Sequence, residues 1–95
     1  MKISVVCGNG LGTSLMMEMA LKGIVKDLGI DASVEHMDLG SVAGSSSDIY
    51  VGTRDIATQI QSQGVQGIVV SLDNMVDKVA MKDRLCDALK QLGAL

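Results

Sequence analysis

The stretch CGNGLGTS, residues 7–14, contains the side chain best suited to covalent chemistry, the thiol of Cys7. This cysteine ends a run of strand-forming residues, Ile3 to Val6, and a helical pattern follows within a few residues. Amide groups at the start of a helix are unpaired and carry partial positive charge, so they bind anions and stabilise a thiolate. Cys7 is therefore predicted to be a reactive nucleophile.

The turn after Cys7 has the composition of an anion-binding loop. Its glycines allow several backbone N–H groups to point inward, and its last two residues add hydroxyl donors. We expect the thiolate to attack a phosphoryl group and form a phosphocysteine whose oxygens the loop holds. The predicted phosphate-binding residues are Gly8, Asn9, Gly10, Leu11, Gly12, Thr13 and Ser14. The plainer alternative is a buried cysteine at a strand end, with glycines that serve only the turn.

Other kinds of site find less support in the sequence. The spacing GNGLG lacks the final x-x-G of a dinucleotide fingerprint, and no Gly-Lys-Ser/Thr follows as in a Walker loop. One histidine, His36, and two distant cysteines give no metal-ligand spacing, so we expect no metal and no cofactor. We expect His36 to be an exposed or hydrogen-bonded strand residue, and we assign no acid–base role to Asp48 and Asp55.

The elements that must position Cys7 alternate between strand and helix patterns. Strands are predicted at 3–6, 32–39, 49–51 and 67–72, and helices at 13–28, 53–63 and from Asp73 or Asn74 to about Leu92, with a loop over 40–48. Strands separated by helices predict an α/β fold with a parallel sheet covered on both faces, a three-layer α/β/α sandwich of flavodoxin or Rossmann type.

The order of the strands decides which loops meet. If the order is 2-1-3-4, it reverses between the first and third strands, and ligands bind beyond the carboxyl ends of strands at such a point. The loop at 7–14 and the segment 52–55 would then meet at one edge of the sheet. Arg54 would lie at the rim of this crevice. Two roles are open for it: an ordinary solvent-exposed side chain, or a contact with the phosphate or with a partner protein.

Hydrophobic periodicity predicts which helix faces are buried. In the first helix the expected buried face comprises Leu15, Met16, Met19, Ala20, Ile24 and Leu28. One of the adjacent Met16 and Met17 should enter the core, and the other could be exposed near Cys7. In the last helix the expected buried residues are Leu85, Ala88, Leu89 and Leu92, with Cys86 packed beside them.

Composition limits the classes of protein that this chain can represent. Its 95 residues, of which 47% are hydrophobic, predict a single domain over residues 1–95. A net charge of −3 without a basic block argues against nucleic-acid binding. No apolar run has the length of a membrane span and no signal peptide is evident, so we expect a cytoplasmic protein with Cys7 and Cys86 reduced.

The sequence Cys7-Gly8-Asn9-Gly10-Leu11-Gly12-Thr13-Ser14 resembles the signature of IIB components of the bacterial phosphoenolpyruvate-dependent sugar phosphotransferase system. The likeness extends over nearly the whole chain and is strongest to the ascorbate and galactitol group, the ascorbate type above all. It implies a four-stranded parallel sheet in the order 2-1-3-4. It also implies that Cys7 accepts phosphate from a phosphohistidine on a IIA protein and passes it to a sugar, L-ascorbate, at the IIC permease.

Two other functions remain as alternatives. Low-molecular-weight tyrosine phosphatases and the related arsenate reductases share this architecture and a Cys-x-x-x-x-x-Arg-Ser loop. In this chain Thr13 occupies the arginine position, and the absence of proline excludes an Asp-Pro acid loop. A regulatory IIB-like module that reads phosphorylation is the third possibility, although such modules usually belong to longer chains.

Overall fold

Four short aliphatic segments form one parallel sheet. The computed structural model describes residues 1–7, 11–65, 67–72 and 78–93. The strands are β1 (Lys2–Cys7), β2 (Ser33–Asp38), β3 (Ile49–Thr53) and β4 (Ile68–Leu72). They pair in the order β2-β1-β3-β4, all parallel, as the sequence predicted. The order reverses between β1 and β3, so the expected switch point lies beside Cys7.

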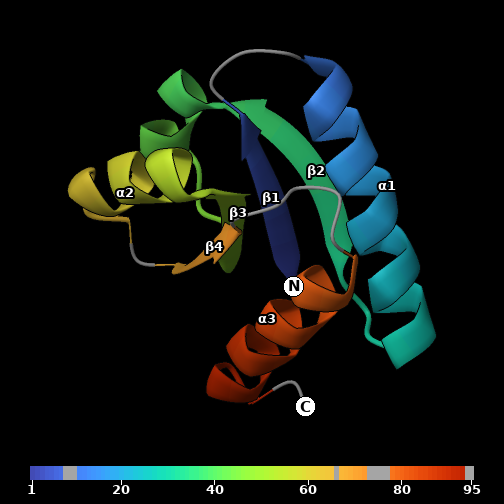
Figure 1. Ribbon diagram of the computed structural model, residues 1–95. Helices are drawn as coiled ribbons and strands as arrows, with labels where there is room; N and C mark the ends of the chain where they lie inside the picture. Colours follow the sequence, from blue (N-terminus) through green and yellow to red (C-terminus); the bar gives the residue numbers. More distant parts are fainter. Residues whose placement is uncertain (8–10, 66, 73–77, 94–95) are drawn as a thin grey trace.

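Helices cover both faces of the sheet. They are α1 (Leu11–Leu28), α2 (Arg54–Ser62) and α3 (Lys78–Gln91), with a 3-10 helix, η1 (Leu39–Gly44), between β2 and β3. Side chains of α1 and α3 pack on one face, and those of α2 and η1 pack on the other (Figure 1). Placing α1 and α2 on opposite faces keeps both strand–helix–strand crossovers right-handed, since β2 and β4 lie on opposite sides of β1 and β3. The fold is therefore the three-layer arrangement that the alternating pattern predicted.

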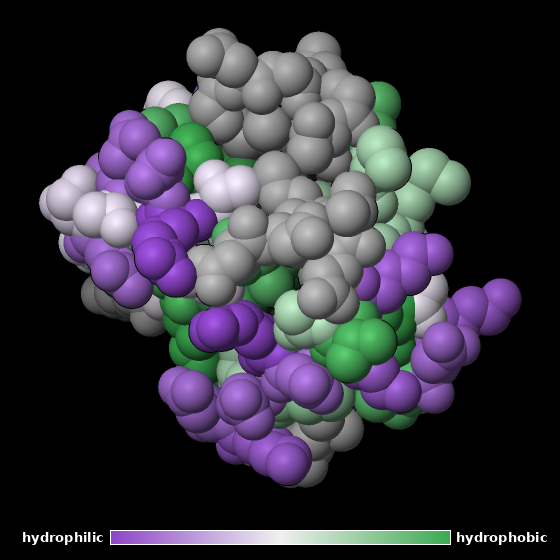
Figure 2. All heavy atoms as spheres, in the orientation of Figure 1, coloured by the Kyte–Doolittle hydropathy of each residue, from purple (hydrophilic) through white to green (hydrophobic). Residues whose placement is uncertain are grey.

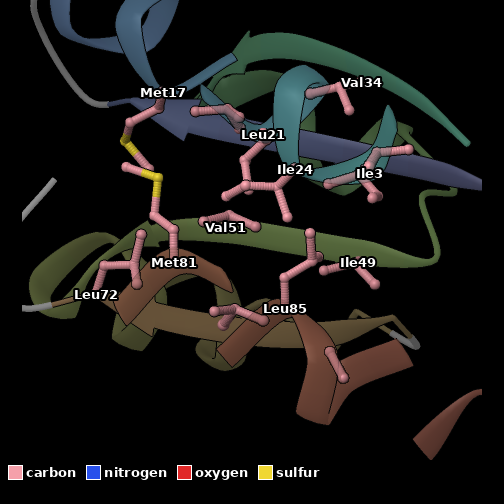
Figure 3. Close-up of a cluster of buried hydrophobic side chains, with 14 of the residues drawn as sticks. Ile3, Met17, Leu21, Ile24, Val34, Ile49, Val51, Leu72, Met81 and Leu85 are labelled. Carbon is pink, nitrogen blue, oxygen red and sulfur yellow. The ribbon is translucent and has the colours of Figure 1, made fainter. Parts of the chain in front are cut away.

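The larger core lies between the sheet and the pair α1 and α3. Met17 of α1 and Met81 of α3 are 0% and 2% exposed, and Figure 3 shows their side chains pointing toward one another above Val51. Leu21 and Leu85 continue the same contact layer farther along the two helices. Because the core is almost free of aromatic residues, flexible methionines fill the space where the two helices approach.

Glycine ends α1 by a conformation that other residues rarely adopt. Gly29 has a φ of +69°, and its N–H donates to the carbonyl oxygen of Lys26 at 3.1 Å. The next residue, Ile30, donates to the carbonyl oxygen of Val25 at 3.1 Å. These two bonds satisfy carbonyl groups at the helix end and turn the chain toward β2, as the sequence predicted.

Three expectations from the sequence need correction. The segment Leu39–Gly44, expected as the end of a strand at residue 39 and a loop from residue 40, forms η1, which Asp38 caps by accepting a hydrogen bond from the Ser41 N–H at 2.8 Å. Leu92 is 41% exposed because α3 ends at Gln91. The predicted face of α1 is wrong for Leu15, Met16 and Met19, as described below. The proposed caps of α3, Asp73 and Asn74, lie outside the described residues.

Within the described ranges, no helix has both the length and the apolar character needed to cross a bilayer.

Candidate functional site

Cys7 is the last residue of β1, at the carboxyl end of a strand that has a neighbour on each side. It lies opposite Asp38, the last residue of β2, in the parallel register. The backbone of α1 begins at Leu11. Gly8, Asn9 and Gly10 lie outside the described residues, as do the side chains of Cys7 and of residues 11–14.

The helix that follows Cys7 is long and begins four residues after it, at Leu11. It runs for 18 residues, and the backbone of Gly12, Thr13 and Ser14 belongs to its first turn. The N–H groups of a first helical turn have no partner within the helix, and the helix dipole adds partial positive charge there. No acidic side chain lies in this turn, so no fixed negative charge of the turn opposes an anion. This end of β1 therefore favours a thiolate or a phosphate.

The carboxyl end of β3 lies at the same edge of the sheet. The register pairs Val5 with Val51, and continuing it places Cys7 level with Thr53. Arg54 starts α2, and a hollow of about 270 Å³ is lined by Thr53, Arg54, Asp55 and Leu72. Arg54 is exposed and takes part in an interaction within the molecule. The structure thus brings the predicted segment 52–55 to the edge where Cys7 ends its strand.

Gly52 is a positioning residue that the sequence reasoning missed. A Cβ atom on Gly52 would lie 2.9 Å from Ile56 Cγ2 and 3.3 Å from the carbonyl oxygen of Val6. Only glycine lets β3 and the first turn of α2 approach Val6, the residue before Cys7, this closely. A glycine inside the apolar run IYVGT was the available signal.

The outer side of α1 carries an apolar patch next to this edge. We define the α1 patch as Leu15, Met16 and Met19, which are 44%, 60% and 72% exposed. Figure 2 shows hydrophobic colour on the outer side of the half of α1 nearer its start and hydrophilic colour farther along. The buried residues are Met17, Leu21, Ile24 and Val25. Of the predicted set, Ile24 is buried and Ala20 and Leu28 pack against the core, whereas the three residues of the α1 patch are exposed. Apolar residues surround nearly the whole first half of α1, so periodicity alone does not identify the inner face.

Other residues weighed in the sequence lie away from Cys7 or are engaged elsewhere. His36 Nδ1 lies 3.3 Å from Glu18 Oε2, on the outer side of the edge strand β2. Asp48 and Asp55 flank opposite ends of β3 and form no pair, and the Asp48 carboxylate accepts the Lys2 N–H at 2.8 Å. Cys86 is a half-buried free thiol on α3. In the part of the chain that the structure describes, no His, Cys, Asp and Glu side chains gather as metal ligands.

A larger hollow, of about 480 Å³, lies at the opposite end of the sheet and is lined by residues of the serine-rich segment 45–47. The Tyr50 hydroxyl beneath it accepts the Ser47 N–H at 3.1 Å and lies 2.9 Å from Ser45 Oγ. The hydroxyls of Ser4 and Ser47 are also hydrogen-bonded to each other. These polar groups are hydrogen-bonded to one another. We therefore interpret them as a structural hydrogen-bond network that lines the hollow, and not as a second candidate site.

Comparisons with known proteins agree with this geometry. The family model described as "PTS system, Lactose/Cellobiose specific IIB subunit" matches residues 2–91. An ascorbate-specific PTS system EIIB component of Mycoplasma pneumoniae is 29% identical over 89 residues, covering 92% of this chain and 93% of the relative. Another, of Shigella boydii, is 30% identical over 91 residues, covering 94% and 89%.

Two solved structures share the fold. The lactose-specific IIB domain of Streptococcus pneumoniae superposes with a TM-score of 0.55 at 15% identity, covering 97% of this chain and 93% of that one. A low-molecular-weight protein tyrosine phosphatase of Bacillus subtilis gives a TM-score of 0.52 at 18% identity, covering 98% and 95%. At these identities the likeness concerns the fold alone.

The family model spans residues 2–91, and the relatives are similar over almost their full length. The chain therefore belongs to the IIB family of the phosphoenolpyruvate:carbohydrate phosphotransferase system (PTS).

Proposed function

We propose that this chain is a cytoplasmic phosphoryl carrier in which Cys7 is the acceptor. IIB components of the PTS are phosphotransferases that work with IIA and IIC components. In the proposed relay a phosphohistidine on a IIA protein donates to Cys7, and phosphocysteine then donates to a sugar bound by a IIC permease. The protein would thus exchange one phosphoryl group between two partners through a single sulfur atom.

The observation that carries the proposal is the position of Cys7 at the carboxyl end of β1, next to the start of α1 and at the reversal of strand order. A sulfur at this place can reach an incoming phosphorus while unpaired N–H groups of the helix face the phosphate oxygens. Phosphoryl transfer needs mainly positioning and stabilisation of charge, and the proposed arrangement would supply both.

Atoms and electrons balance over the two transfer steps, because the thiolate consumed in the first step is regenerated in the second. In the first step the sulfur lone pair forms the S–P bond while the N–P bond of phosphohistidine breaks, and the imidazole nitrogen keeps the electron pair. In the second step an oxygen of a sugar hydroxyl, which loses its proton, forms the O–P bond while the S–P bond breaks. The thiolate is regenerated, so no oxidant or hydrolytic water is needed.

We assign the phosphate cradle to the backbone of Gly8, Asn9, Gly10, Leu11 and Gly12 and to the groups of Thr13 and Ser14. This segment contains no Arg or Lys. Neutral N–H and hydroxyl donors would hold the phosphate less firmly than a guanidinium, which suits a group that must leave again. A phosphatase would need the stronger clamp, and Thr13 occupies the position where the phosphatase loop has arginine.

The sugar is proposed to be L-ascorbate, because relatives alike over nearly their full length are named ascorbate-specific. The matching family model names lactose and cellobiose instead. Transport of labelled ascorbate, lactose and cellobiose by cells that depend on this chain would decide between these substrates. Uptake of ascorbate alone is expected.

The decisive experiment is the intact mass of the protein after incubation with phosphoenolpyruvate and the upstream relay proteins. We expect a gain of one phosphate that Cys7→Ser abolishes and that Cys86→Ser, the matched control for a lost thiol, leaves unchanged. Thr13→Ala and Ser14→Ala should slow the gain without abolishing it. Labelling that survives in the Cys7→Ser variant would refute the assignment.

A further inference from the structure

The two edges of the sheet differ sharply in chemical character. The edge strand β2 has the sequence SVEHMD, and its Glu35 forms an ion pair with Lys2 at 3.8 Å. The edge strand β4 has the sequence IVVSL, without charge or proline. Natural proteins protect exposed edges with charges, proline or coverage, because an unprotected edge is a template for pairing with another chain. By this criterion β2 is protected and β4 is not.

The outer edge of β4 presents to a groove backbone groups that have no partner among the residues that the structure describes. The Ile68 N–H donates to the Asp48 carbonyl oxygen at 2.9 Å, so Ile68 faces β3. Backbone groups alternate in direction along a strand, and Val69 and Ser71 therefore direct their N–H and C=O groups away from β3. A hollow of about 240 Å³ lies along this edge, between β4 and α3. Figure 1 shows β4 as the outermost strand on this side of the sheet.

Charges on the α3 side of the groove indicate which chain would fill it. Arg84 and Asp87 line the groove three residues apart, both are exposed, and neither forms an ion pair with a residue that the structure describes. Figure 2 shows hydrophilic colour over the outer surface of α3. A second copy related by a two-fold axis runs α3 in the opposite direction. Its Asp87 would then face Arg84 of the first copy, and its Arg84 would face Asp87, so the groove is complementary to itself in charge.

On the other face of the sheet, the helix beside β4 has no charges near this edge that would repel a second copy. There α2 packs against β4, and its exposed residues from Thr58 to Ser62 carry no charge. Two copies of this helix brought near each other by a two-fold axis would therefore not repel. The Cys7 end also stays clear, because β3 separates β4 from β1.

We propose that two copies of this chain form a homodimer by antiparallel pairing of their β4 strands, which joins the two sheets into one. With the two-fold axis at Val70, Val69 of each copy lies opposite Ser71 of the other. This register forms about four backbone hydrogen bonds and places the two α3 helices side by side on one face. The small contact area makes the dimer weak and dependent on concentration.

The first test measures sedimentation of the natural chain from about 10 µM to 1 mM, a range chosen for a weak interface. We expect a reversible monomer–dimer equilibrium, with the Val69 and Ser71 amides gaining protection from hydrogen exchange as concentration rises. Ser71→Pro removes an N–H that has no partner in the described part of the monomer, so the monomer should stay folded by circular dichroism while the dimer weakens at least about tenfold. A chain that stays monomeric throughout would overturn the proposal.

The second test exchanges the groove charges. Arg84→Asp and Asp87→Arg should each weaken self-association by roughly tenfold, because each places like charges across the axis. An equimolar mixture of the two variants should form a heterodimer, since one copy is then acidic and the other basic along the groove. Lys82→Asp and Asp83→Arg change the same charges on α3 outside the groove and should have no effect. A dimer that Ser71→Pro and both groove variants leave unchanged would disprove pairing through β4.

Discussion

Gly52 shows how one residue without a side chain positions the candidate site. It lies near the end of β3, where Ile56 of α2 and the Val6 carbonyl group both approach the space that a Cβ would fill. Val6 is followed directly by Cys7, so any displacement of Val6 caused by a side chain at position 52 would reach the proposed acceptor through one peptide unit. Glycine is required here because β3, α2 and β1 approach one another too closely for a Cβ atom.

We predict that Gly52→Ala lowers the free energy of unfolding by about 1–3 kcal/mol, because the new methyl group overpacks a closed contact. It should also slow phosphorylation of Cys7. Urea denaturation and the rate of mass gain measure the two effects. Gly23→Ala is the matched control: Gly23 lies in α1 with no heavy atom within 4 Å of its Cβ position. That change should stabilise the protein by about 0.5–1 kcal/mol and leave the rate unchanged. Normal rates in both variants would show that Gly52 does not position Cys7.

At the scale of elements, two adjacent methionines of α1 have different roles: one is buried and the other is exposed. Met17 is fully buried against Met81 of α3, and Met16 is 60% exposed in the α1 patch. One face of the helix thus anchors it to α3, while the other offers apolar surface near Cys7. Methionine suits both roles, since its flexible side chain fills irregular gaps and adapts to different partners.

We expect Met17→Ala to lower the free energy of unfolding by about 2–5 kcal/mol, because it leaves a cavity between α1 and α3. The same change one residue earlier, Met16→Ala, should cost less than about 0.5 kcal/mol because that side chain lies in solvent. Denaturant titration of both variants compares them directly. Equal losses would mean that α1 is rotated relative to the face described here.

The order and type of the elements could be predicted because apolar strand runs and helical patterns alternate clearly. The end of β1 at Cys7 and the stop of α1 at Gly29 followed from residue types alone. The inner face of α1 could not be predicted, because Leu15, Met16 and Met19 are as apolar as the residues that are buried. The glycine inside IYVGT could have marked Gly52 as a place of close approach, but its neighbours Val6 and Ile56 could not be predicted, since they depend on the spacing of β1, β3 and α2.

At the scale of the whole molecule, the two ends of the sheet have different tasks. The carboxyl ends of β1 and β3 form the candidate site. The amino ends hold the hydroxyl network of Tyr50, in which the buried Ser47 N–H is the donor. In β1 the network includes Ser4, which lies three residues before Cys7. Stability and transfer should therefore respond to different substitutions.

Tyr50→Phe is predicted to lower the free energy of unfolding by about 1–3 kcal/mol, because the Ser47 N–H loses its partner in a buried place. The rate of Cys7 phosphorylation should not change. Ser46→Ala, at an exposed position in the same segment, is the control and should alter neither quantity. Thermal unfolding and mass labelling report the two outcomes. A slower rate in the Tyr50→Phe variant would mean that the ends of the sheet are coupled.

The inner position of β1 has a consequence for how the chain is made. In chain order β1 precedes both of its neighbours, β2 on one side and β3 on the other, and its register partners extend to Val51. Lys2 reaches as far as Asp48, whose N–H donates to the Lys2 carbonyl oxygen at 2.9 Å. During synthesis β1 can pair with β2 first, but it lacks its second neighbour until β3, Ile49–Thr53, has been made. The central strand that ends at Cys7 therefore becomes fully paired only after these later contacts, distant in sequence, have formed.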